Sequence, residues 1–266
     1  MIAQLELDWM GGPAERRMRR RRPGIDDLPW GTLAATPIDE DDAVAARLSW
    51  TDGAFREYAS AAAFSALTTA LLEAGAPIDL VAMCADFVVD EMVHVELNGR
   101  VAAELGGAAP YRVDLDKVAP YIDPALPAIE RAAELALTTS CVGEALSVPS
   151  LAGSMRASHH PLTRAVLARI VRDEGPHARL GWLVLDWAGD RIDRARLAGV
   201  ARDRIAAYAP LWTCDDCDES DPAQRAIAGW MSDEDTRIAL TRAVRDDIVR
   251  PLAARGIVVD ASDLVP

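Results

Sequence analysis

Histidine, aromatic residues and strand-forming runs are all scarce in this chain of 266 residues. Phe, Trp and Tyr make up 5% of the sequence, whereas half of the residues are hydrophobic and many of these are alanine. Few strand-forming runs among many helix formers predict a mostly helical protein without a sheet. The length is sufficient for one large domain, or two small ones, with a complete hydrophobic core.

Long apolar runs are also missing. No run of about 18 apolar residues occurs, so the sequence does not predict a transmembrane helix. The one strongly basic stretch, RRMRRRR at residues 16–22, is not followed by the apolar segment of an export signal. We therefore expect a cytoplasmic protein without a membrane partner, and interpret the basic stretch as a solvated arm or one that folds back onto the acidic body.

The net charge of −14 argues against nucleic acid as a partner, because phosphate repels an acidic surface.

Cysteine occurs four times, at Cys84, Cys141, Cys214 and Cys217. The last two form a C-x-x-C pair, but a tetrahedral zinc or rubredoxin-type site needs four ligands and no second pair exists. Without a signal peptide, no disulfide framework is needed. We interpret Cys214 and Cys217 as surface thiols or a local disulfide.

Helix-forming segments bounded by glycine and proline cover most of the chain. Four long helices are expected at about residues 41–74, 78–105, 124–148 and 161–187, with the third ending before Pro149. Two amphipathic helices should follow at about 190–208 and 233–254, separated by an acid-rich loop. Four long helices in two pairs predict an all-α fold built on an antiparallel four-helix bundle. The expected divisions are an irregular arm at residues 1–40 and one helical domain at 41–266, with its core bundle at about 43–187 and the added helices at about 190–254.

Two of the four histidines end the same five-residue pattern, DEMVH at residues 90–94 and DEGPH at residues 173–177. Composition alone would give this repeat with odds on the order of 10⁻⁴. Residues i and i+3 share one face of a helix, so Glu91 and His94 point together, as do Glu174 and His177. A carboxylate and an imidazole aimed at one point are ligands that iron and manganese accept readily.

Two such pairs predict two metal ions, which need one further carboxylate from each of the other two helices. The glutamates in small, apolar surroundings on those helices are Glu57 and Glu144. The alternatives are a solvated helix face and a zinc-only site, but several buried glutamates aimed at one core need a compensating cation. The predicted metal-binding and catalytic residues are therefore Glu57, Glu91, His94, Glu144, Glu174 and His177.

The first acid of each pattern has a separate predicted role. Metal-bound histidines usually donate their second N–H to a carboxylate, which fixes the tautomer of the ring. Asp90 and Asp173 point away from their neighbouring glutamates, toward an adjacent helix. We expect each to support the cofactor site from the opposite half, Asp90 through His177 and Asp173 through His94.

The surroundings of the site carry two further predictions. Gly175 and Pro176 should kink or bulge the fourth helix beside the metals. Small residues near the ligands either line a cavity closed by Phe64, Phe87 and Trp182 or only allow close helix packing. These small residues are Ser60, Ala61, Cys84, Ser140, Cys141, Ser147 and Gly181.

With these ligand positions, residues 43–187 resemble the ferritin-like superfamily of di-iron carboxylate proteins. The resemblance implies a ferritin-like bundle with two additional C-terminal helices and an irregular N-terminal arm. It also implies two iron ions or a manganese–iron pair, O₂ as co-substrate, a small organic substrate and an external electron donor. A monomer or small homo-oligomer is expected, because the arm and the C-terminal helices would obstruct the contacts of a ferritin shell.

Departures from individual families narrow the expected function. A rubrerythrin would carry a second C-x-x-C pair. Ribonucleotide reductase small subunits have a radical tyrosine one or two turns beyond the ligands of the second helix, whereas here Asn98 follows Glu91 by seven residues. The N-oxygenases have a third histidine at the position where this sequence has Ile170. We therefore expect an O₂-dependent oxidoreductase, a monooxygenase or oxidase. The alternatives are an iron-handling ferroxidase or storage protein, and a scaffold that keeps the ligands without turnover.

Overall fold

The computed structural model describes residues 2–4, 7–107, 109–114, 118–213, 221–262 and 264. Within them the protein is almost entirely helical, as the sequence predicts. The strands described are β1 (Ile2–Gln4) and β2 (Arg112–Asp114), an antiparallel pair in which Ile2 lies opposite Asp114. This small sheet was not predicted. Cys214 and Cys217 lie outside the described residues, so their interpretation stays a prediction.

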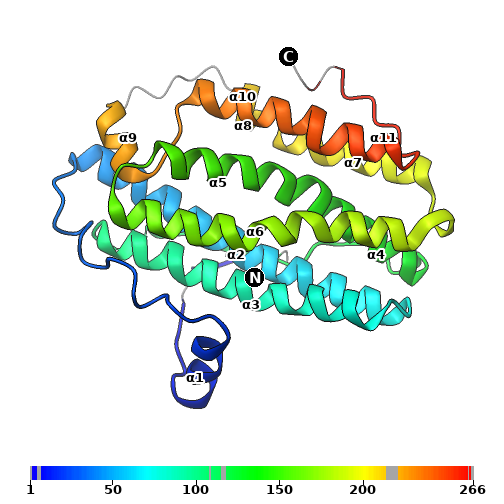
Figure 1. Cartoon of the computed structure of the whole chain (residues 1–266), viewed down its shortest axis with the longest axis horizontal. Helices are drawn as coiled ribbons and strands as arrows, with labels where there is room; N and C mark the ends of the chain where they lie inside the picture. Colours follow the sequence, from blue (N-terminus) through cyan, green and yellow to red (C-terminus); the bar gives the residue numbers. More distant parts are fainter. Residues whose placement is uncertain are drawn as a thin grey trace.

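The long helices lie side by side in the order that the sequence predicts (Figure 1). Helix α2 (Glu40–Glu73) is followed, after a turn in which Gly75 has a φ of 66°, by α3 (Ile78–Glu104). The third long segment joins α4 (Ala128–Ala136), a π-helical part η2 (Leu137–Glu144) and α5 (Ala145–Ala157) without a break. Helix α6 (Pro161–Ala188) follows after three residues. Because these connections are short, each pair of neighbours runs antiparallel.

Pro149 does not end the third helix, contrary to the prediction. The helix continues through Pro149 to Ala157. A proline inside a helix removes one backbone hydrogen bond and costs about 3 kcal/mol. Here it follows the π-helical part by one turn, where the regular hydrogen-bond ladder is already shifted. Packing of this segment against α6 stabilises it in spite of the proline.

The uninterrupted segment Ala128–Ala157 is long and apolar enough to cross a membrane by length and composition alone, which the sequence analysis did not expect. Its most apolar stretch of 18 residues has a mean hydropathy of 1.2, and 56% of that stretch is buried inside the protein. It also carries the buried carboxyl of Glu144. A buried core helix can have the same length and apolar composition without crossing a membrane.

The N-terminal arm is not irregular throughout, because it contains helix α1 (Gly12–Arg21). Pro13 stands in its first turn, where a missing N–H costs nothing. Glu15 lies in the first turn and three arginines lie in the last, so the charges complement the helix dipole. The arm folds back onto α3, which decides between the two interpretations of the basic stretch. Helix α1 itself stands out from the long helices (Figure 1).

The C-terminal helices form a further layer over α5 and η2 (Figure 1). The 3₁₀ turn η3 (Gly189–Arg191) leads into α7 (Arg194–Tyr208), and α10 (Asp233–Ala243), η4 (Val244–Val249) and α11 (Arg250–Ala254) form one continuous helix. The sequence predicts both long elements. It misses α8 (Pro210–Thr213) and α9 (Pro222–Ala228), two short helices in the segment expected to be a loop.

A polar layer divides the core along α3 and α6. Toward one end of these helices, Leu97 and Ile170 belong to one apolar cluster, and toward the other end Phe87 and Leu180 belong to another. Buried glutamates and histidines occupy the turns in between. Charged groups therefore lie in the middle of the core, where burial is costly without compensation.

Close packing explains at least one of the small residues near this layer. A Cβ atom added to Gly181 would lie 2.5 Å from the sulfur of Cys141 and 2.8 Å from the carbonyl oxygen of Ala136. Helix α6 and the third helix thus approach so closely here that only glycine fits. At Gly181 the small side chain serves packing rather than a cavity.

The Gly181→Ala substitution should therefore lower the free energy of unfolding by about 1–3 kcal/mol through overpacking. Gly199→Ala is the matched control, since nothing lies within 4 Å of an added Cβ in the middle of α7. The control should stabilise the protein by about 0.5–1 kcal/mol, because alanine is the better helix former. Chemical denaturation of both variants measures the difference. Equal effects would show that α6 and η2 do not approach as described.

Candidate metal centre

The structure brings all six predicted ligand residues together from four helical segments. Glu57 lies on α2, and Glu144 is the last residue of the π-helical part η2. The other four lie on α3 and α6. They form two groups, each with one ligand atom per residue and all of these atoms within 4.8 Å of one another, a geometry that could hold a metal ion. The groups are Glu57, Glu91, His94 and Glu174, and Glu91, Glu144, Glu174 and His177.

Glu91 and Glu174 belong to both groups, so their carboxylates lie between the two positions. One oxygen of Glu174 lies 3.0 Å from Nδ1 of His94, and the other lies 2.9 Å from Nδ1 of His177. Glu91 likewise faces both rings, at 3.5 Å and 3.1 Å. The imidazole centroids are 6.0 Å apart. A carboxylate shared in this way can bridge two metal ions about 4 Å apart.

The shortest distances between these atoms, 2.9–3.1 Å, are close to the edge of an octahedral coordination shell, whereas Glu57 and His94 are 3.8 Å apart. Six ligands at about 2.1 Å from a metal ion lie about 3.0 Å from their neighbours. Although the ligand atoms are this close, both oxygens of Glu91 and the Nδ1 atoms of His94 and His177 are buried without a hydrogen bond of acceptable geometry. Buried polar atoms in native proteins are nearly always satisfied. Atoms that converge without bonding one another fit a cation at their common centre.

Burial is nearly complete on all sides except one. The side chains of Glu91, His94 and His177 have no solvent exposure, and that of Glu174 has 1%. The Glu57 side chain is 15% exposed. Solvent therefore reaches the cluster from the α2 side.

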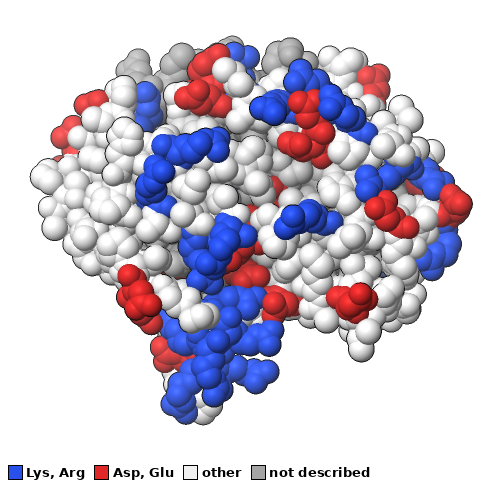
Figure 2. Space-filling model, in the orientation of Figure 1, with Lys and Arg blue, Asp and Glu red and all other residues white. Residues whose placement is uncertain are grey.

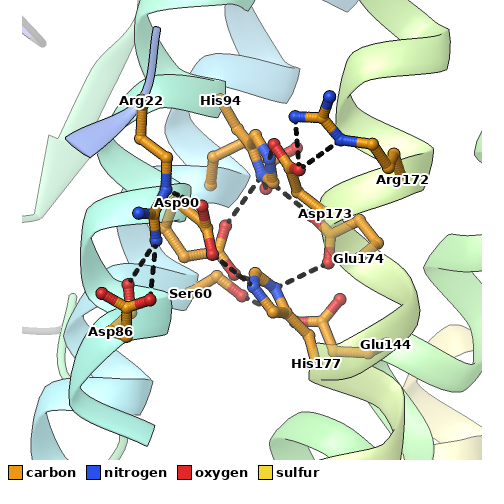
Figure 3. A network of polar contacts seen from close by, with 12 residues as sticks. Arg22, Ser60, Asp86, Asp90, His94, Glu144, Arg172, Asp173, Glu174 and His177 are labelled. Carbon is orange, nitrogen blue, oxygen red and sulfur yellow. Dashed lines mark hydrogen bonds and ion pairs between the residues drawn. The ribbon is translucent and has the colours of Figure 1, made fainter. Parts of the chain in front are cut away.

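Burial favours the protonated form of two carboxyl groups in the cluster. Burial raises the pKa of Glu57 from 4.5 to about 8, and the charges of Glu91 and Glu174 add to this against the effect of His94. Burial likewise raises the pKa of Glu144 well above its usual value, together with the same two negative charges. Glu144 also accepts a hydrogen bond of 3.0 Å from the Ser60 hydroxyl (Figure 3). Too many acids share this space for all to be ionised without a cation.

Both imidazoles of the cluster have raised pKa values. Burial by itself would lower the pKa of His177, but the carboxylates of Asp90 and Glu174 raise it to about 12. The pKa of His94 is also raised well above its usual value, against the effect of burial. Burial would raise the pKa of Glu174, yet contact with the two imidazoles lowers it to about 2. A metal ion would replace these protons, since a ligating imidazole must be neutral on the metal side.

Each histidine faces, at Nε2, the aspartate that the sequence assigns to it. Nε2 of His177 lies 3.5 Å from Asp90, and Nε2 of His94 lies 3.6 Å from Asp173 (Figure 3). An N–H that faces the aspartate at Nε2 leaves Nδ1 free on the side of the glutamates. The two aspartates thus favour the tautomer that can bind metal in both halves.

Sequence reasoning missed the arginines that contact these aspartates. Arg22 from the N-terminal arm donates to Asp90, and Arg169 and Arg172 donate to Asp173 at 2.7 Å and 2.9 Å. Arg169 precedes Asp173 by one helical turn, a spacing that predicts an ion pair and could have identified it. No local spacing identifies Arg22, which is 68 residues from its partner.

The π-helical backbone lies in the third helix, whereas the sequence predicts a kink or bulge in the fourth; the kink at Gly175 and Pro176 stays a prediction. Helix α6 is assigned as one α-helix through Pro176, whereas η2 is π-helical and ends at Glu144. A π-helical turn widens the helix and changes the direction of the side chains after it. The third helix, not the fourth, therefore has the bulge beside the cluster.

Aromatic side chains enclose His177. Its ring centroid lies 4.1 Å from that of Phe87 and 5.3 Å from that of Phe64. Cys84, on the same side, is fully buried, and burial raises the pKa of its thiol to about 11. Trp182 instead stacks on the guanidinium of Arg255, away from this enclosure. These contacts keep water from one end of the cluster.

Comparison with known proteins does not assign the chain to a family. No protein-family model, no curated protein and no solved structure matches it. The interpretation of the site therefore rests on its own residues and geometry.

The pKa values predict how pH acts on the metal-free protein. Glu57 and His177 bind protons more tightly when folded, so their stabilisation is complete below their unfolded pKa values of about 4.5 and 6.5. It is lost as pH rises toward about 8 and about 12. The melting temperature of metal-free protein should therefore fall between pH 5.5 and 8.5. Added Mn²⁺ or Fe²⁺ should raise it more at pH 8.5, because metal replaces protons. Equal metal-induced shifts at both pH values would contradict this.

Asp90→Asn and Asp173→Asn should lower metal affinity by about 10- to 100-fold while the fold survives, because each variant loses the charge that orients one imidazole. Asp86 is no neutral control, since it pairs with Arg21 and Arg22. Asp203, exposed on α7, is suitable, and Asp203→Asn should change stability by at most about 0.5 kcal/mol. Metal titration and thermal melting compare the three variants. Identical affinities would remove any role for the aspartates.

Proposed function

We propose that this chain is a ferritin-like di-iron carboxylate protein that activates O₂ to oxidise a small organic substrate. In this proposal the four long helical segments are an antiparallel four-helix bundle, and α7 and α10–α11 are the two additional C-terminal helices. The observation that carries it is the pair of four-residue groups that share Glu91 and Glu174.

The chemistry of the ligands favours iron or manganese. Each group supplies one imidazole nitrogen with several carboxylate oxygens and contains no thiolate. Sites of this kind suit iron and manganese, whereas soft metals prefer sulfur ligands. Bound iron would supply the electrons for O₂ reduction, taken in turn from an external donor. The protein supplies the fixed geometry, the orientation of the imidazoles and the exclusion of water.

The uneven burial of the cluster supports access for a small molecule. Glu57 is partly exposed, while the ligands on α3 and α6 are enclosed. O₂ and a substrate would approach from the α2 side, near Glu57 and Ser60. Phe64, farther along α2, and Phe87 on α3 exclude water around His177 through their ring contacts.

The layers around the long helices favour an enzyme over an iron-storage subunit. Helices α7 and α10 cover α5 and η2, and the arm covers part of α3. A storage shell would need outer helix surfaces for contacts between subunits. We therefore propose a monomer or small homo-oligomer, with ferroxidase or storage activity as the alternative outcome of the test.

The test is metal content followed by O₂ consumption. Anaerobic titration with Fe²⁺ should bind two ions per chain, and the reduced protein should then consume O₂. Glu57→Gln should weaken one ion, and Glu91→Gln should weaken both, because Glu91, unlike Glu57, belongs to both groups. Glu73→Gln, an exposed position on the same helix as Glu57, should bind as the wild type does. Binding of one ion or none would refute the proposal, whereas a large shell with many irons per chain would favour storage.

A further inference from the structure

The N-terminal arm contacts Asp90 directly and Asp173 through an arginine. The side chain of Arg22 donates through Nε to Asp90, and its Nη2 donates to Asp86 at 3.1 Å (Figure 3). The next residue, Pro23, accepts a hydrogen bond of 3.0 Å from Arg169 through its carbonyl oxygen. Arg169 in turn pairs with Asp173. Of the two Asp–His pairs, the arm therefore contacts the one that contains Asp90.

The two halves of the site obtain their guanidinium groups in different ways. Asp173 has Arg169 four residues before it on the same helix, at 2.7 Å. The equivalent position before Asp90 is Asp86, a second acid. Helix α3 thus cannot neutralise Asp90 itself, and Arg22 lies between the two acids that need it.

The two aspartates obtain their positive charge from different parts of the chain. Arg169 and Arg172 of α6 both contact Asp173, whereas Arg22 of the arm is the arginine that contacts Asp90 among the described residues. The side chains of Arg22 and Asp90 are only 13% and 12% exposed, so water screens this pair weakly.

We propose that Arg22 is a positioning residue of the metal centre, which holds Asp90 against His177 and makes the N-terminal arm a part of one half-site. This inference rests on the proposed metal-binding function. Arg22 acts on the metal through two other side chains and does not touch it. By linkage, metal binding and docking of the arm must then stabilise each other.

The arm has other anchors that do not involve the metal site. Arg19 forms two hydrogen bonds with the buried Glu96, at 2.6 Å and 2.7 Å. Glu104 accepts from the backbone N–H groups of Leu33 and Ala34, both at 3.1 Å. These contacts attach the arm without Arg22, so loss of the Arg22 side chain need not release α1.

Arginines on the outer side of α1 provide the control. Figure 2 shows a dense basic patch over this helix. Within the described part of the chain, Arg20 is exposed and has no hydrogen bond or ion pair. Arg20→Gln thus removes one positive charge from the same arm without touching the site.

The experiment titrates metal-free protein with Mn²⁺ and follows the free ion by electron paramagnetic resonance. We expect Arg22→Gln to weaken one of the two ions by about 10- to 100-fold and to leave the other nearly unchanged. Arg20→Gln and Arg19→Gln should bind both ions as the wild type does. Wild-type affinity in Arg22→Gln would overturn the inference while the proposed function stands. An equal loss in Arg19→Gln would also overturn it, because arm docking in general would then be the cause.

Limited trypsin cleavage measures the reciprocal effect without any activity assay. Mn²⁺ should slow cleavage after the arginines at positions 16–21 in the wild type and in Arg20→Gln. It should give no such protection in Arg22→Gln, whose arm is no longer linked to the ions. Equal protection in all three proteins would overturn the inference. A wild type that binds no Mn²⁺ at all would overturn both this inference and the proposed function.

Discussion

Four glutamates converge in a core that offers them almost no water, and the rest of the structure follows from how their charge is compensated. They lie in one polar layer, with apolar clusters on both sides along α3 and α6. Without metal, protons on Glu57, Glu144 and the two imidazoles must balance the charge. Such a layer is stable only if the four helical segments keep the carboxylates at a fixed separation. Close contacts such as that of Gly181 with Cys141 set this separation.

Orientation of the imidazoles is the second requirement, and the two halves meet it differently. In each half an aspartate faces Nε2 and an arginine faces the aspartate. Helix α6 contains its own Arg169, whereas α3 depends on Arg22 from the arm. The repeated DE-x-x-H pattern therefore produces two similar positions with different support. This difference would make the two ions unequal in affinity even though their ligands are alike.

Solvent exposure differs between the residues that would bind metal and those that would contact a substrate. The ligands on α3 and α6 are enclosed, and aromatic rings cover His177. Among the six ligands, Glu57 on α2 is the most exposed, with 15% of its side chain open to solvent. The choice of substrate would thus depend on α2 and its neighbours, which the repeated pattern does not include. A pattern that predicts a metal centre carries little information on the molecule that reacts there.

Local sequence determined the helical class, the bounds of three of the four long helices, the six converging side chains and the pairing of each aspartate with the opposite histidine. Composition and the glycine and proline stops predict the helices, and helix periodicity fixes which residues share a face. The tertiary structure decided the rest: the passage of the third helix through Pro149, the π-helical turn before Glu144, the helix in the arm and the contact of Arg22 with Asp90. These features depend on packing and on charges that are distant in the sequence, where no spacing rule applies. Packing energy outweighs the local cost of a proline, and only the folded chain brings an arginine of the arm to an acid 68 residues away.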